Sequence, residues 1–297
     1  MKRASRNGWS SIRAVGWMAA LAAVMTVGLI TYGAWVRVSG SGLGCPDWPL
    51  CNGVILPQME GDTAIEFGHR AYAGVTALVV GLAALMSLRI RASHPKAARV
   101  VLAAFVLILV QAVLGGITVL TELHGMVRLV HLSTALIILA LLTWAALLGF
   151  ERKGVSNPSV KTATGLLVGA AFVVLMGAAI VGTNNTGACP ALPVCDGRSS
   201  LEASILHALH RGASLLLLGG VIAVGFLLRG TSGARAAVAF NHTAALLILL
   251  QGIVGITAVV QSFPGSLRIL HVALAVLTWW ALVAQFGLVS IGQGRRN

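Results

Sequence analysis

The fold is decided by a stretch that occurs twice, CPDWPLCNG at residues 45–53 and CPALPVCDG at residues 189–197. Self-similarity at a fixed offset is the signature of a duplicated structural unit. We therefore expect two similar halves, each with its own version of the same site. A second, ungapped block recurs 140 positions later, with Gln111, Gly115, Val119, Gly125, Arg128 and His131 returning as Gln251, Gly255, Val259, Gly265, Arg268 and His271.

The composition places the chain in a membrane. Of its 297 residues, 57% are hydrophobic and 10% are charged, with a mean hydropathy of +0.90, whereas soluble domains carry about 25% charged residues. A helix needs roughly 20 apolar residues to cross a bilayer. The first run lacks a small-residue cleavage site, so we interpret it as a retained span rather than a signal peptide. Eight runs qualify, at 13–37, 67–89, 98–120, 126–149, 162–183, 204–228, 236–260 and 267–290.

The charge distribution predicts the topology. Of the 21 lysine and arginine residues, 15 lie on one side of the eight-span arrangement and six on the other, where seven of the eight acidic residues also lie. Positive loops face the cytoplasm, so both termini are predicted to be cytoplasmic. The net charge of +13 therefore reflects topology, and we predict no nucleic-acid partner.

The duplication predicts an all-α integral membrane protein with eight transmembrane helices. An even number of spans in each half gives both halves the same direction, so two tandem four-helix bundles should be related by a pseudo-twofold axis along the membrane normal. We place the N-terminal bundle at 1–150, a cytoplasmic linker at 151–161 and the C-terminal bundle at 162–297. The long outer loops 38–65 and 184–203 are where we expect function to concentrate.

The four cysteines lie in these two outer loops, as two Cys-x5-Cys pairs. The outer compartment of bacteria is oxidising, which favours the disulfides Cys45–Cys51 and Cys189–Cys195. A metal site is the alternative, but zinc sites favour shorter gaps with further ligands nearby. A redox role for Cys45–Cys51 stays open.

Four histidines recur at duplicated positions near the outer surface. We expect His69 and His210 in the first turn of their spans, and His131 and His271 about five residues into theirs. An isolated intramembrane histidine is often a hydrogen-bonded packing residue, but ionisable groups in spans also mark functional sites. Paired imidazoles projecting from facing helices are a common way to ligate haem iron, and the duplication favours that interpretation.

One chemical difference separates the halves. Glu66 lies three residues before His69, on the same helix face, whereas the equivalent residue in the second half is His207. Glu66 could be a helix-start acid favoured by the helix dipole. A di-iron centre would need further carboxylates, and the spans contain none.

Four arginines accompany the histidines. They could extend to the membrane interface or bind haem propionates through charge-assisted hydrogen bonds, and their matched placement favours propionates. We interpret His94 as a surface residue, and His124 and His242 have no counterpart in the other half. Gln111 and Gln251 fit polar packing between helices as well as a ligand role. The four arginines are Arg70, Arg128, Arg211 and Arg268.

The loop SGSGLGCPDWPLC at 39–51, the Glu66-x-x-His69-Arg70 motif and the single histidines in spans 4, 6 and 8 together resemble the bacterial cysteine-containing type of the haem A synthase family. The resemblance covers nearly the whole chain. It implies an oxidoreductase of the inner (plasma) membrane that oxidises a ring methyl of haem O to the formyl group of haem A for cytochrome oxidase.

The resemblance also implies roles for residues and partners. His210 and His271 would ligate a haem b cofactor with Arg211 and Arg268 beside them, and Glu66 would be the catalytic carboxylate. His69 and His131, with Arg70 and Arg128, would surround the substrate haem O. The implied partners are a haem O synthase, an electron donor and membrane lipid, with homo-oligomers left open.

A di-haem b-type electron-transfer cytochrome without catalytic activity is the alternative function. A pure electron carrier needs no difference between its two pockets, so the exchange of Glu66 for His207 favours an enzyme. A transporter would place its polar residues nearer the bilayer midplane.

Overall fold

Eight long helices make up the fold of this computed structural model, which describes residues 2–151, 155, 160–231 and 234–293. All eight are long and apolar enough to cross a membrane, which confirms the predicted all-α membrane protein. A short 3-10 helix, η1 (Ser41–Leu43), follows the first of them. The helices are α1 (Lys2–Ser39), α2 (Gly61–Ile90), α3 (Pro95–Leu120), α4 (Gly125–Gly149), α5 (Val160–Gly182), α6 (Leu201–Leu228), α7 (Arg235–Val260) and α8 (Gly265–Gln293).

Several helices begin earlier than their apolar runs suggested, and in α2 and α6 this changes the position of the histidines. α2 starts at Gly61 and α6 at Leu201, because a polar first turn continues each helix beyond the apolar residues, and Ser200 caps α6 by accepting a hydrogen bond from Ala203 N at 3.2 Å. His69 and His210 consequently lie in the third turn, about 12–14 Å along the helix axis from its start. The expectation that they occupy the first turn was wrong.

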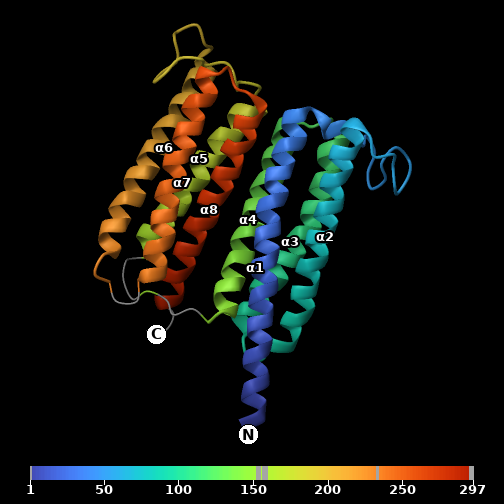
Figure 1. The fold of residues 1–297 in the computed structure, drawn as a ribbon, viewed down its shortest axis with the longest axis vertical. Helices are drawn as coiled ribbons and strands as arrows, with labels where there is room; N and C mark the ends of the chain where they lie inside the picture. Colours follow the sequence, from blue (N-terminus) through green and yellow to red (C-terminus); the bar gives the residue numbers. More distant parts are fainter. Residues whose placement is uncertain (1, 152–154, 156–159, 232–233, 294–297) are drawn as a thin grey trace.

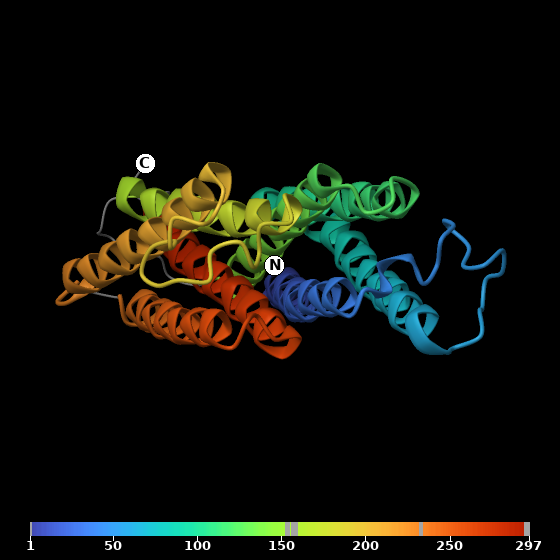
Figure 2. The ribbon, with the colours of Figure 1, turned by 90° about the horizontal axis from the view of Figure 1, so that it is seen from above.

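Each half is a closed ring of four helices. In the first half α1 contacts α2 and α4, and α3 contacts the same two helices; α5, α6, α7 and α8 repeat this pattern in the second half. Figures 1 and 2 show the two bundles side by side. Most of the predicted linker at 151–161 lies outside the described residues, so the domain boundaries stay a prediction.

The two bundles meet along α4 and α8. These helices contact each other, α1 contacts α8, and α5 contacts α4. A pseudo-twofold axis would map the α4–α8 pair onto itself and exchange the α1–α8 pair with the α5–α4 pair. In the most apolar window of α4 and of α8, 56% of the residues are buried, compared with 17–39% in the other six spans. Trp279 Nε1 on α8 also donates a hydrogen bond to Leu136 O on α4 at 3.0 Å.

Close helix contacts at the outer ends repeat in the two halves. A Cβ on Gly125, the first residue of α4, would lie 2.6 Å from Gly182 O at the end of α5, and one on Gly265, the first residue of α8, would lie 2.8 Å from Val38 Cγ1 at the end of α1. Gly125 and Gly265 are equivalent in the duplication, as are Val38 and Gly182. The end of each half's first helix therefore packs on the start of the other half's last helix.

The long outer connections lie together at one end of the molecule, and the start of α1 and the end of α8 lie at the other (Figure 1). This arrangement is the one that the charge distribution requires. Small residues line many of the buried helix faces, among them Ala19, Ala22, Ala83 and Ala145, each fully buried. Small side chains let helix backbones approach closely in membranes.

One such approach joins α1 to α4, and it generates a test. A Cβ on Gly16 would lie 2.9 Å from the Gly149 carbonyl carbon, so Gly16→Leu should force α1 away from α4. Overpacking of this kind costs about 1–3 kcal/mol, and we expect a lower melting temperature in detergent. Gly74→Leu is the control, since nothing lies within 4 Å of its Cβ position. Equal melting temperatures for the two variants would contradict the importance of this contact.

Candidate functional site

The four duplicated histidines share one local environment. Each imidazole lies against a glycine on a neighbouring helix, so that the missing side chain leaves room for the ring. Two of these glycines belong to the recurring block and two to the equivalent first helices, but sequence reasoning had assigned them no role. The distance from the glycine Cβ position to the imidazole Cε1 is 3.3 Å for Gly33–His69, 3.4 Å for Gly115–His131, 3.1 Å for Gly177–His210 and 3.4 Å for Gly255–His271.

In the C-terminal half the two imidazole rings lie close together, tilted by 60° to one another. The ring centroids of His210 on α6 and His271 on α8 are 6.2 Å apart. Two metal–nitrogen bonds of about 2 Å each, together with the inner halves of two rings, span a similar length. His210 Nδ1 also donates a hydrogen bond to Val173 O at 3.0 Å. Metal-bound histidines commonly make this second bond, which leaves Nε2 free for the metal.

The N-terminal half is arranged differently. Its His69 ring packs edge-to-face on Tyr32 of α1, with ring centroids 5.6 Å apart, and the described residues show no ring contact between His69 and His131. Both Nδ1 atoms are buried without a hydrogen-bond partner, as is Nδ1 of His271 in the other half. Gln111 holds this side of α4 by donating to His131 O at 2.9 Å, which supports the helix-packing interpretation of Gln111.

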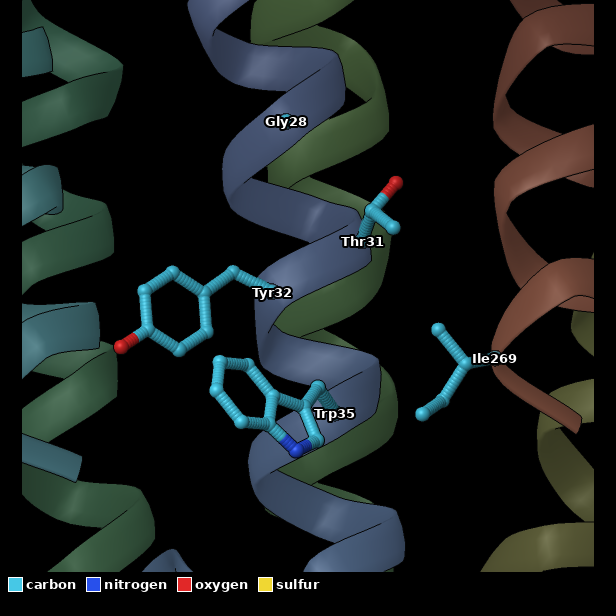
Figure 3. A pocket seen from close by; sticks show the side chains of 5 residues that line it. All are labelled: Gly28, Thr31, Tyr32, Trp35 and Ile269. Atoms are coloured by element: carbon cyan, nitrogen blue, oxygen red, sulfur yellow. The ribbon is translucent and has the colours of Figure 1, made fainter. Parts of the chain in front are cut away.

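A shallow, open pocket of about 440 Å³ is lined by residues of α1 and by Ile269 of α8. Figure 3 shows Thr31 on α1 and Ile269 on α8 pointing toward one another, while Tyr32 extends to the side of α1 away from α8. Tyr32 both lines this pocket and contacts His69, so Tyr32 separates the apolar surface from His69.

The residue pair that distinguishes the halves is buried. Glu66 and His207 are each 6% exposed. Glu66 Oε1 accepts a hydrogen bond from Arg70 Nε at 3.0 Å, and within the described residues its other oxygen accepts none. His207 Nε2 instead donates to Asn185 O in the outer loop at 3.0 Å. One pocket therefore has a buried carboxylate with a free oxygen, and the other has a histidine bound to the loop.

Both cysteine pairs are disulfide-bonded, Cys45 to Cys51 and Cys189 to Cys195, which confirms the predicted pairing. An arginine binds the carbonyls of each small ring. Arg70 donates to three carbonyls of the first ring and Arg211 to three of the second, and two of the three acceptors are equivalent in the two rings. The acceptors are Asp47 O (2.8 Å), Leu50 O (2.9 Å) and Cys45 O (2.8 Å) for Arg70, and Ala191 O (2.9 Å), Pro193 O (2.9 Å) and Cys189 O (3.1 Å) for Arg211.

The sequence analysis did not predict these hydrogen bonds of Arg70 and Arg211 to the ring carbonyls. They attach the outer rings to α2 and α6, one residue after His69 and His210. Most N–H groups of Arg70 are used in this way, so propionate binding by Arg70 and Arg211 stays a prediction with less support than for the other two arginines. Arg128 and Arg268 each have a buried Nε without a partner.

The first ring has an additional bond network. The Asp47 carboxylate accepts hydrogen bonds from Asn52 N at 2.6 Å and Gly53 N at 2.8 Å. These backbone donors, that of Gly53 first, hold the pKa of Asp47 below its usual value, so the carboxylate stays ionised at neutral pH. Trp48 packs on Gly116 of α3, beside Gly115. The second ring has Ala191 in place of Asp47 and lacks this turn.

The remaining histidines lie elsewhere. His124 is exposed at the start of α4, and His242 is exposed near the start of α7. His94, at the N-terminal end of α3, contacts Ser93 Oγ at 3.0 Å. None of the three joins either histidine pair.

Comparison with known proteins identifies the family. A family model described as cytochrome oxidase assembly protein (COX15-CtaA) matches residues 16–64 and 58–283. The chain belongs to this family. A haem A synthase of Bacillus pumilus (strain SAFR-032) is 31% identical over 264 residues, which cover 84% of this chain and 86% of the relative. A haem A synthase of Shouchella clausii (strain KSM-K16) is 29% identical over 88% of this chain and 92% of its own length.

The residues of this COX15-CtaA family member fit a haem. An iron ligand pair needs two imidazole nitrogens with open space between them, and the described contacts leave Nε2 of all four histidines without a hydrogen bond. Haem also carries propionates, and the buried, unpartnered Nε atoms of Arg128 and Arg268 lie one turn outward of His131 and His271.

The arginine–ring contact can be tested by Arg70→Gln. A hydrogen bond to a charged group contributes about 1.5–3 kcal/mol, and about 1.4 kcal/mol corresponds to a factor of ten. We expect backbone amides of residues 45–60 to exchange with deuterium at least about tenfold faster than in the wild type. Arg198→Gln removes an outer charge whose only described bond is made by its backbone N, and it should change nothing. Unchanged exchange in Arg70→Gln would contradict the contact.

Proposed function

We propose that this protein is a haem A synthase, which oxidises a ring methyl group of haem O to the formyl group of haem A for cytochrome oxidase. The observation that carries the proposal is the asymmetry between two otherwise matched histidine pockets, buried Glu66 in one and buried His207 in the other. The relatives named haem A synthase support the same reaction.

The C-terminal pocket is proposed to hold a resident haem b on His210 and His271. The closely spaced rings and the Nδ1 bond of His210 to Val173 support this choice, because they prepare a ligand pair before any haem arrives. Haem b, when bound, supplies one-electron transfer. The protein's part is to fix the imidazoles against Gly177 and Gly255 and to exclude water from the pocket.

The N-terminal pocket is proposed to take haem O between His69 and His131. These rings do not contact each other, and the apolar pocket beside Tyr32 is open to an apolar part of the substrate. A substrate site must also release its product. Two histidines that are not held in position for iron beforehand suit that requirement better than a preorganised pair. Arg128 would bind a propionate here, as Arg268 would in the other half.

Glu66 is proposed as the catalytic carboxylate. With water as the source of oxygen, oxidation of the methyl group to hydroxymethyl and then to formyl releases two protons and two electrons in each step. The electrons go to the electron-transfer partner, and a carboxylate beside the reacting carbon can accept a proton. It can also stabilise positive charge that develops there. Arg70 orients Glu66 through Oε1, and the other oxygen is free to face the substrate.

The proposed setting follows from the same reasoning. The charge distribution supports a multi-pass protein of the plasma membrane with both termini in the cytoplasm, and the two histidine pockets on the outer side. The reaction requires a haem O synthase to supply substrate and an electron-transfer partner. Homo-oligomers remain a prediction.

The haem b assignment is tested by His210→Ala and His271→Ala. Each variant removes one of the two iron ligands, so purified protein should lose the low-spin b-type absorption spectrum. His124→Ala serves as the control, because His124 is exposed and lies outside both pairs. A full low-spin spectrum in both ligand variants would refute the assignment.

Glu66→Gln separates binding from chemistry. The amide has nearly the same shape but can neither accept a proton nor stabilise a positive charge, so haem b should be retained while haem A production falls by at least about a hundredfold. Extracted haem, analysed by chromatography, should be haem O or its hydroxymethyl derivative. Glu122→Gln, in an exposed outer turn, should make haem A normally. Wild-type haem A from Glu66→Gln would show that Glu66 is only a structural acid.

A further inference from the structure

We propose that Arg37, Arg128 and Arg268 form one anion site at the junction of the two bundles, and that this site receives a propionate carboxylate from the haem in each pocket. The three residues are called the arginine triad below. The proposal rests on the proposed function in taking haem as the ligand. It adds a residue, Arg37, that neither the duplication nor the histidine motifs point to.

The helix ends bring the triad together. Val38 at the end of α1 packs on Gly265, the first residue of α8, and Arg268 follows Gly265 by less than one turn. α4 and α8 contact each other, which brings Arg128 to the same junction. Arg37 lies within electrostatic range of both other arginines. Three cations from three helices thus meet at the outer end of the interface.

No acidic residue balances this charge. Among the described residues, no carboxylate lies within 4.0 Å of any triad guanidinium, and the ion pair that does occur joins Arg70 to Glu66. The Nε atoms of Arg128 and Arg268 are buried and have no hydrogen-bond partner. Like charges that lie close together at a half-buried site repel strongly. A buried hydrogen-bond donor without a partner lowers the stability of the fold by about 1–3 kcal/mol. An anion would remove both penalties.

Arg37 has no charged counterpart in the second half. Gly33 and Gly177 are equivalent, so the counterpart of Arg37 is Val181, one residue before Gly182. The first half therefore supplies a cation at the junction where the second supplies an apolar residue. Because the triad has two equivalent arginines and only one Arg37, Arg37 is shared between the two pockets.

The position of the triad indicates a carboxylate of the haem as the ligand. Arg128 and Arg268 lie three residues outward of His131 and His271, on the same helix faces. Arg37 lies four residues outward of Gly33, which contacts His69. All three guanidinium groups are thus about one turn outward of the imidazoles. The planar fork of arginine suits carboxylate groups.

The test measures haem binding by full-length protein in phosphatidylcholine nanodiscs. His271→Ala leaves the N-terminal pair intact and His131→Ala the C-terminal pair, so each pocket is titrated separately with ferric haem and with its dimethyl ester. Adding Arg37→Gln should weaken ferric haem binding about tenfold in both backgrounds, the loss of one charge-assisted hydrogen bond. Binding of the diester should not change. Arg37→Lys should recover part of the loss, and Arg198→Gln should have no effect.

Three outcomes would overturn the proposal. Equal weakening for the acid and the diester would make Arg37 a structural residue, and weakening in only one background would make it a residue of one pocket. An Arg37 effect on ferric haem that needs phosphatidylglycerol in the nanodiscs would identify a lipid phosphate as the ligand. These measurements are independent of haem A production, so a protein that binds as described but makes no haem A would contradict only the proposed function.

Discussion

The site depends on space for four imidazole rings between closely packed helices. In a membrane, helices associate through close packing of small residues, and a ring cannot enter such an interface unless a neighbouring side chain is absent. Gly33, Gly115, Gly177 and Gly255 provide that absence. Each histidine is therefore positioned by a residue on another helix, and the four-helix ring has to close before either pair exists.

The duplication explains how one scaffold supports two roles. The glycine–histidine contacts, the disulfide rings and the arginines that bind those rings recur in both halves, which is consistent with the proposal that each half encloses a haem. The differences are few and lie near the rings: Glu66 against His207, Asp47 against Ala191, and Arg37 against Val181. Each of them changes charge or hydrogen bonding while leaving the helix packing unaltered.

The sequence predicted the elements better than the contacts. Eight apolar runs and two Cys-x5-Cys pairs are local patterns, and each was confirmed. The depth of His69 and His210 was misjudged because a polar first turn carries no apolar signal. The binding of ring carbonyls by Arg70 and Arg211, and the meeting of Arg37 with Arg268, depend on which helices are neighbours in space. The spacing of residues along the chain does not show which helices are neighbours. The recurrence of Gly115 as Gly255 was nevertheless a signal that could have identified the glycine–histidine contacts.

If both pockets hold haem as proposed, the contact between α4 and α8 determines what lies between the two irons. These two central helices carry His131 and His271, one from each pocket, and Trp279 joins them directly through its hydrogen bond to Leu136. Two irons bound at these histidines would be separated by packed protein, with neither lipid nor bulk water between them. Electrons could then tunnel from one pocket to the other within a single chain, and an external redox partner would need access to only one of the two.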